Sequence, residues 1–156
     1  MNTLRIARLV AAKDLRIEWN SRVLTNQVLP FAGVTMVIFA FALDSDAVLQ
    51  RVAPGLVWLA TMFSLLVLVQ RTFAVETDDG ALDALRVAGV DPRAIYLGKA
   101  SGLFVQLLVL EVVLLFAAVV LYGQTVPLDG VVLLVTTAIS ATCGLAAVGT
   151  LYGGLA

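Results

Sequence analysis

The feature that most constrains this chain is a series of four apolar segments, each long enough to cross a lipid bilayer. A helix of about 20 apolar residues spans the roughly 30 Å hydrocarbon core. Backbone groups inside a bilayer must satisfy one another, so such segments fold as helices. The sequence therefore predicts an all-α, polytopic membrane protein. We expect one transmembrane domain, residues 1–156, with spans at residues 23–43, 52–71, 92–122 and 130–152.

Composition supports this fold class and argues against several functions. Hydrophobic residues make up 61% of the chain and charged residues 13%, whereas soluble domains are about 45–50% apolar and about 25% charged. The net charge of −1 gives no reason to expect nucleic-acid binding. The chain has no histidine, the commonest metal ligand and general base. We therefore predict no catalytic residue, no metal site and no directly bound cofactor.

The first segment, residues 1–22, is basic and is predicted to form an interfacial helix on the membrane lipid. Ile6, Val10 and Ile17 share one helical stripe, and Trp19 suits the boundary with the headgroups. A plain, positively charged flank is the equally weighted alternative. The basic residues of this segment are Arg5, Arg8, Lys13, Arg16 and Arg22.

The longest polar stretch after residue 22 lies between the second and third spans, at residues 76–91. Asp78 or Asp79 can cap a helix N-terminus, and Gly89 is typical of the position just after a helix. Asp91 followed by Pro92 predicts the start of the next helix. The stretch is therefore predicted to hold a short helix between two membrane helices.

This short helix has one apolar face that could enter a groove of a soluble partner. Leu82 and Leu85 lie three residues apart on that face. Asp83 and Arg86 could meet charges at the rim of the groove, and Gly80 permits a tight approach to the second span. The residues predicted to couple to a partner are Glu76, Asp78, Asp79, Gly80, Leu82, Asp83, Leu85 and Arg86.

Basic residues also predict the orientation. They concentrate in the N-terminal segment and around residues 71–99, whereas the loop after the third span has none. The positive-inside rule then places the N-terminus and residues 76–91 in the cytoplasm.

Glu111 lies near the middle of the third span, where an acidic residue costs roughly 2.5–3.5 kcal/mol to insert. It could ionise, pair with a charge or line a polar path, or it could be a neutral acid bonded to a neighbouring helix. Depth in the membrane makes Gln106, Tyr122 and Thr137 candidate partners. Small-residue pairs predict close helix packing, and these are Gly98 with Gly102 and Gly149 with Gly153.

Two motifs carry a resemblance to known transporters. The run Glu76-Thr77-Asp78-Asp79-Gly80-Ala81-Leu82-Asp83-Ala84-Leu85, with Gly98-Lys99 opening the next span, resembles the E-x-x-x-G-x-L-x-x-L…GK hinge of ABC-2-type permeases. The Glu-x-Asp-Asp-Gly form, with residues 51–58 upstream, resembles the CcmB family, the haem exporter B permeases of cytochrome c maturation. The resemblance runs from about residue 5 to the end. Members of that family continue with two further spans, so the chain resembles a shortened permease.

The resemblance implies a non-catalytic permease subunit in a bacterial plasma (inner) membrane. The implied partners are a CcmA-like ATPase that uses ATP, CcmC-like and CcmD-like membrane subunits and, indirectly, the haem chaperone CcmE. Haem is then a candidate substrate of the complex. Two alternatives stay open. One is an ABC-2 permease for a lipid, drug or glycan, and the other is a proton-coupled secondary transporter that uses Glu111.

Overall fold

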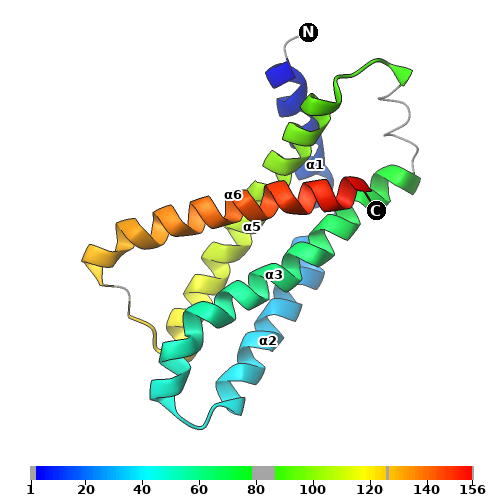
Figure 1. Cartoon of the computed structure of the whole chain (residues 1–156). Coiled ribbons are helices and arrows are strands. Elements are labelled where there is room, and N and C mark those ends of the chain that lie inside the picture. Colours follow the sequence, from blue (N-terminus) through cyan, green and yellow to red (C-terminus); the bar gives the residue numbers. More distant parts are fainter. Residues whose placement is uncertain (1–2, 79–86, 126, 156) are drawn as a thin grey trace.

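The computed structural model describes residues 3–78, 87–125 and 127–155, and across these ranges the chain is helical with no strand. Four of the described helical segments are long and apolar enough to cross a membrane, so the predicted fold class is confirmed. Figure 1 shows the helices, which are α1 Thr3–Ser21, the π-helical turn η1 Leu24–Val28, α2 Leu29–Ala42, α3 Asp46–Asp78, α5 Pro92–Tyr122, the 3-10 turn η2 Leu128–Gly130 and α6 Val131–Leu155.

Helix α5 is the element on which the others pack, since it contacts α1, α2, α3 and α6. Buried residues recur along it at every fourth position. Four residues exceed one helical turn, so each step rotates the buried line by about 40°. The line therefore winds around α5 and presents different sides to different helices. Its members are Ala94, Gly98, Gly102, Gln106, Leu110, Leu114, Ala118 and Tyr122.

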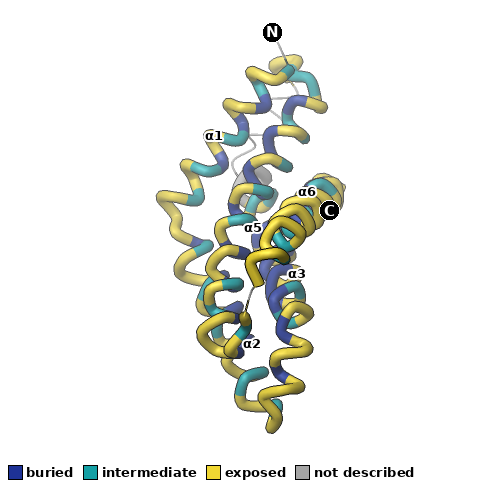
Figure 2. The backbone as a smooth tube through the Cα atoms, turned by 90° about the vertical axis from the view of Figure 1, so that its left-hand side faces the viewer, coloured by how far each residue is buried: buried dark blue, intermediate teal, exposed yellow. Residues whose placement is uncertain are grey.

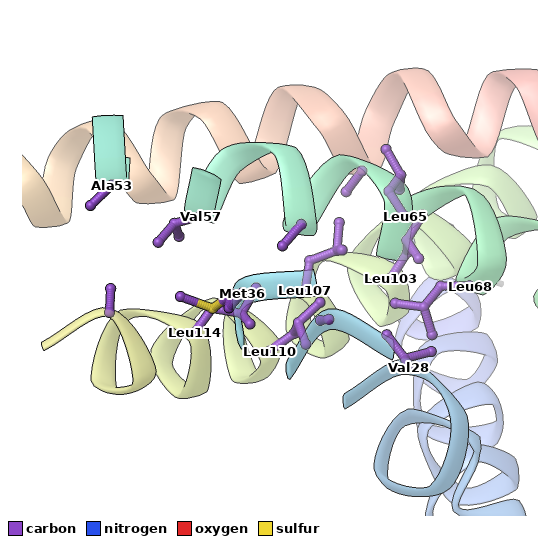
Figure 3. Packing of buried hydrophobic residues seen from close by; sticks show 14 of the residues in the cluster. Val28, Met36, Ala53, Val57, Leu65, Leu68, Leu103, Leu107, Leu110 and Leu114 are labelled. Carbon is purple, nitrogen blue, oxygen red and sulfur yellow. The ribbon is translucent and has the colours of Figure 1, made fainter. Parts of the chain in front are cut away.

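The hydrophobic core lies between α2, α3 and α5. Met36 of α2, Leu68 of α3 and Leu107, Leu110 and Leu114 of α5 are almost fully buried there, and Figure 3 shows these side chains pointing toward one another. Burying each such side chain stabilises the fold by roughly 1.5–3 kcal/mol in water. Inside a bilayer the gain comes from close packing instead, because lipid is as apolar as leucine.

Helix α6 crosses α5 and α3 and is the most exposed of the four candidate spans (Figures 1 and 2). Only Thr142, Ala146, Gly149 and Thr150 are buried on it. These residues follow a three- to four-residue spacing, so they form a single face. The rest of α6 presents apolar side chains outward, as expected for a lipid-facing helix.

Two prolines shape the helices in different ways. Pro30 lies in the first turn of α2, directly after the π-helical turn Leu24–Val28, so it marks the start of a regular helix. Pro54, by contrast, lies inside a helix. The second span was predicted to start at residue 52, but α3 begins earlier, at Asp46.

The helix tolerates Pro54 because another residue replaces the missing hydrogen bond. Proline has no N–H, so the carbonyl oxygen four residues earlier, at Gln50, loses its helical donor. The Gln124 side-chain amide Nε2 donates to that oxygen at 2.5 Å. Nearby, the Tyr122 hydroxyl donates to the Met36 carbonyl at 2.8 Å. The ends of α2, α3 and α5 are thus held together at this end of the molecule.

At the opposite end, α1 lies along the first half of α5 in very close contact (Figure 2). A Cβ atom added at Gly98 would lie 2.5 Å from the Val10 Cβ and 2.7 Å from the Ala7 carbonyl oxygen. One added at Gly102 would lie 3.5 Å from the Asp14 Cβ. The two glycines therefore face α1.

The buried face of α1 differs from the predicted stripe. The structure buries Ala7, Val10 and Asp14, whereas Ile17 is 39% exposed. The predicted stripe was the face turned toward the lipid, whereas the buried face packs against α5. Packing against glycines instead favours small residues, because these let two backbones approach.

We expect Gly98→Ala to lower the free energy of unfolding by about 1–3 kcal/mol in detergent micelles, because its methyl group would overlap the Val10 side chain and the Ala7 carbonyl. Gly33→Ala in α2 is the matched control, since a Cβ there meets nothing within 4 Å. Denaturation followed by circular dichroism measures both. If Gly98→Ala left the free energy of unfolding unchanged, the packing of α1 would not need this close approach.

Candidate functional site

Most of the predicted coupling residues lie outside the described residues. These are Asp79, Gly80, Leu82, Asp83, Leu85 and Arg86. The backbone of Glu76 and Asp78 is helical and belongs to α3. Asp78 is the last residue of α3 that the structure describes, and the helix that Asp78 or Asp79 was predicted to cap lies outside the described residues. The second span was predicted to end at Arg71, but α3 continues to Asp78. No proline or glycine occurs in residues 72–78 to end the helix.

The far side of the polar stretch has the predicted stop and start signals. Gly89 has φ +69°, the left-handed conformation that glycine favours after a helix. The Asp91 carboxylate accepts a hydrogen bond from the Arg93 backbone N–H at 3.0 Å, with Pro92 in the first turn of α5. The Thr3 hydroxyl also donates to the Asp91 carboxylate, at 3.4 Å. The start of α5 is therefore well defined and touches the start of α1.

Where α3 ends and α5 begins, the structure buries a lysine at the junction of three helices. Lys99 is 2% exposed. Its ammonium nitrogen lies 3.6 Å from the Asp14 Oδ2 of α1 and 3.4 Å from the Thr72 carbonyl oxygen of α3. The same nitrogen lies 4.7 Å from the centre of the Phe73 ring, a cation–π contact. One side chain thus connects α1, α3 and α5.

Asp14 is the acidic partner in this junction and is 8% exposed. Its Oδ1 also lies 3.2 Å from the Lys13 ammonium at the surface. Its Oδ2 is too far from Lys99 for a hydrogen bond and accepts none within the described residues. A buried carboxylate without its cation would be strongly destabilising. The ion pair therefore fixes the position of α1 relative to α5.

The predicted packing glycines lie around this junction. Gly98 and Gly102 bring α1 close enough for Asp14 to reach Lys99. On α6, a Cβ at Gly153 would overlap the Phe73 ring, and one at Gly149 would lie 3.0 Å from the Leu65 and Val69 side chains. Phe73 is thus packed between α6 and Lys99. Three of the four candidate spans, α3, α5 and α6, therefore meet here together with α1.

Next to the junction lies a small polar cavity of about 30 Å³. A volume of that size holds one or two water molecules, which suits polar walls. No cluster of metal-ligating side chains occurs in residues 3–78, 87–125 or 127–155. A water molecule in this cavity would donate a hydrogen bond to the Asp14 carboxylate. Its walls are formed by Asp14, Ile17, Glu18, Ser21, Arg71, Thr72 and Gln106.

Glu111 lies away from this junction, between α5 and α6. It is 3% exposed, and the Thr142 hydroxyl donates to its Oε2 at 2.7 Å. The predicted partners Gln106, Tyr122 and Thr137 are therefore wrong. Tyr122 donates to α2 instead, and the Thr137 hydroxyl donates within its own helix to the Leu133 carbonyl. The crossing of α6 over α5 selects Thr142, and depth in the membrane cannot reveal that crossing.

Sequence reasoning missed Asp14, Thr72 and Phe73 as members of the junction. One signal for Asp14 was present, because an aspartate beside Lys13 lies on the same face as Ala7 and Val10. Thr72 contributes only a backbone oxygen, for which no side-chain pattern exists. Phe73 looks like an ordinary apolar residue near the end of a span.

The fold and this junction define a class: a multi-pass, all-helical membrane protein whose spans meet beside a polar inter-helix stretch. The chain belongs to the CcmB family, described as "CcmB protein", which matches over residues 5–156.

The sequence identity to individual relatives is modest. "Heme exporter protein B" of Rhodobacter capsulatus is 34% identical over 67 residues, which is 43% of this chain and 30% of that protein. The protein of the same name from Paracoccus denitrificans is 30% identical over 77 residues, covering 49% and 35% of the two chains. That of Escherichia coli K12 is 26% identical over 90 residues, covering 57% and 41%.

The match thus spans about a third of the length of these curated relatives, with a range of 30–41%. No solved structure matches the chain.

The ion pair can be tested by a double-mutant cycle on Asp14→Asn and Lys99→Met. Each single change should lower the free energy of unfolding by about 3 kcal/mol, because it leaves a buried charge unpaired. In the double variant the free energy of unfolding should fall by clearly less than the sum of the two single effects, since both charges are gone. Lys13→Met, at a 41% exposed side chain, should lose less than about 1 kcal/mol. Strict additivity of the two changes would contradict an interaction between Asp14 and Lys99.

Proposed function

We propose that this chain is the membrane subunit of an ABC exporter complex that supports haem export or haem-chaperone release in cytochrome c-type biogenesis. Family membership, the match to proteins named "Heme exporter protein B" and the four spanning helices support this proposal. In this proposal a separate CcmA-like subunit hydrolyses ATP, CcmC-like and CcmD-like subunits complete the complex, and CcmE acts indirectly. The chain itself has no catalytic role.

The polar stretch at residues 76–91 faces the cytoplasm in this proposal. Charge supports that orientation, because the basic N-terminal segment contacts the start of α5 through Thr3 and Asp91. The loop between α2 and α3 and the loop after α5 meet at the other end, where Gln124 bonds to Gln50. The two polar ends of the bundle thus differ in charge as the positive-inside rule requires.

The observation that carries the proposal is the junction around Lys99. Residues 76–91 connect the end of α3 to the start of α5, and Lys99 ties those two helix ends together and to α1. A partner that moves this stretch therefore displaces three helices as one unit. Such a rigid connection is what an ATPase in a separate subunit needs to act on the membrane helices.

Replacing Leu82 and Leu85 together by Asp tests this coupling. A buried leucine contact contributes roughly 1.5–3 kcal/mol, so the double change should release the ATPase on co-purification. The spans should remain folded, because the proposal places both residues outside the membrane.

Leu128→Asp is the matched control for this experiment. Leu128 is 91% exposed and lies at the opposite end of the bundle. The same chemical change there should leave the ATPase bound. If the Leu82 and Leu85 variant retained the ATPase as well as Leu128→Asp does, residues 76–91 would not be the docking site.

Glu111 offers a test of whether an ionisable group is needed inside the membrane, and a separate measurement addresses the proton-coupled alternative. Glutamine keeps an oxygen that accepts the Thr142 hydrogen bond but cannot ionise. We expect Glu111→Gln to accumulate normally in the membrane while cytochrome c yield falls, which would show that ionisation matters. Full activity of the variant would assign Glu111 to packing against α6. Transport driven by a pH gradient without any ATPase would instead favour the secondary transporter.

A further inference from the structure

A groove between α1, α5 and α6 has the form of a binding site for an amphiphile. It is a groove of about 810 Å³ with α5 as its floor and α1 and α6 as its walls. Sites for small molecules commonly have volumes of about 300–1,000 Å³. The Tyr96 hydroxyl donates to the Ala147 carbonyl at 3.1 Å, which joins the floor to the α6 wall. The groove is therefore part of the packed structure.

The groove is polar at one end and apolar along the rest of its length. Helices α1 and α5 run in the same direction, since Thr3 contacts Asp91, and Asp14 lies beside Gly102. Arg8 therefore lies level with the first turns of α5, toward the end proposed to be cytoplasmic. Leu15 and Phe104 line the groove further along.

Arg8 is the sole charged side chain among the described residues that line the groove. It is exposed and makes no ion pair with another described residue. An arginine at the headgroup level favours an anionic group, because its guanidinium forms paired hydrogen bonds with phosphate. The apolar walls beyond it favour a hydrocarbon chain.

We propose that this groove binds one anionic phospholipid, with the headgroup phosphate at Arg8 and an acyl chain along Leu15 and Phe104 toward Cys143. The order of polar and apolar lining matches the order of groups in such a lipid. A lipid seated there would fill the space between α1 and α6, which both pack against α5. The proposal concerns a lipid site on this chain and does not depend on what the complex transports.

The only cysteine of the chain provides the probe, because Cys143 is exposed and lines the groove. The full chain in dodecyl maltoside micelles is treated with N-ethylmaleimide, and the rate of thiol modification is measured. Phosphatidylglycerol should slow the reaction at concentrations where phosphatidylcholine does not. A neutral reagent is used so that the charge of the micelle does not alter its local concentration.

Arg8→Gln should raise the phosphatidylglycerol concentration needed for half protection by about fivefold, as expected for the loss of one arginine contact with an anionic lipid. Arg8→Lys should restore most of the protection, which shows that the loss is not a folding defect. Arg16→Gln is the matched control, since Arg16 is exposed on α1 but does not line the groove, and it should behave like the unaltered chain. A cysteine moved to the loop, Ser45→Cys with Cys143→Ser, should not be protected.

Equal protection by phosphatidylcholine and phosphatidylglycerol would overturn the proposal, because the groove would then select only for a hydrocarbon chain. The proposal would also be overturned if Arg8→Gln needed the same phosphatidylglycerol concentration for half protection as the unaltered chain. Protection of Cys143 by hemin at lower concentrations than by phosphatidylglycerol would assign the groove to a porphyrin instead.

Discussion

The structure depends on the close approach of α1 to the first half of α5. Gly98 and Gly102 permit it, and the Asp14–Lys99 pair requires it. A lysine ammonium that is only 2% exposed is strongly destabilising unless an anion lies close to it. The anion comes from a helix that precedes the first span, so the N-terminal segment is an integral part of the bundle. The glycine and the lysine of the Gly98-Lys99 pair therefore have distinct roles, one steric and one electrostatic.

The spans could be predicted from the sequence because membrane helices obey simple rules. The apolar length of the spans and the Asp91-Pro92 start of α5 depend only on local residues, and the structure has both features. The length of α3 was underestimated at both ends. The predicted span left out the polar residues before 52 and after 71. Nothing in residues 46–51 or 71–78 prevents a helix from continuing through them.

The contacts between helices could not be predicted to the same degree. Thr142 meets Glu111 because α6 crosses α5 at a particular point, and that crossing depends on three-dimensional packing. The Lys99 site includes a backbone oxygen of Thr72, which every residue type would supply. The glycine pairs were recognised from spacing alone, but spacing does not say which helix they face. Gly98 and Gly102 face α1, whereas Gly149 and Gly153 face α3.

The hydrogen bond from Gln124 to the carbonyl that Pro54 leaves free has a mechanical consequence. Together with the bond from Tyr122 to Met36, it fastens α5 to its neighbours at the end remote from the polar stretch. Helix α5 has 31 residues, which makes a rod about 46 Å long. A rod held at one end behaves as a lever with a fixed pivot. Displacing its other end by about 5 Å tilts it by only about 6°, so a large movement where α5 begins becomes a small rotation at its far end.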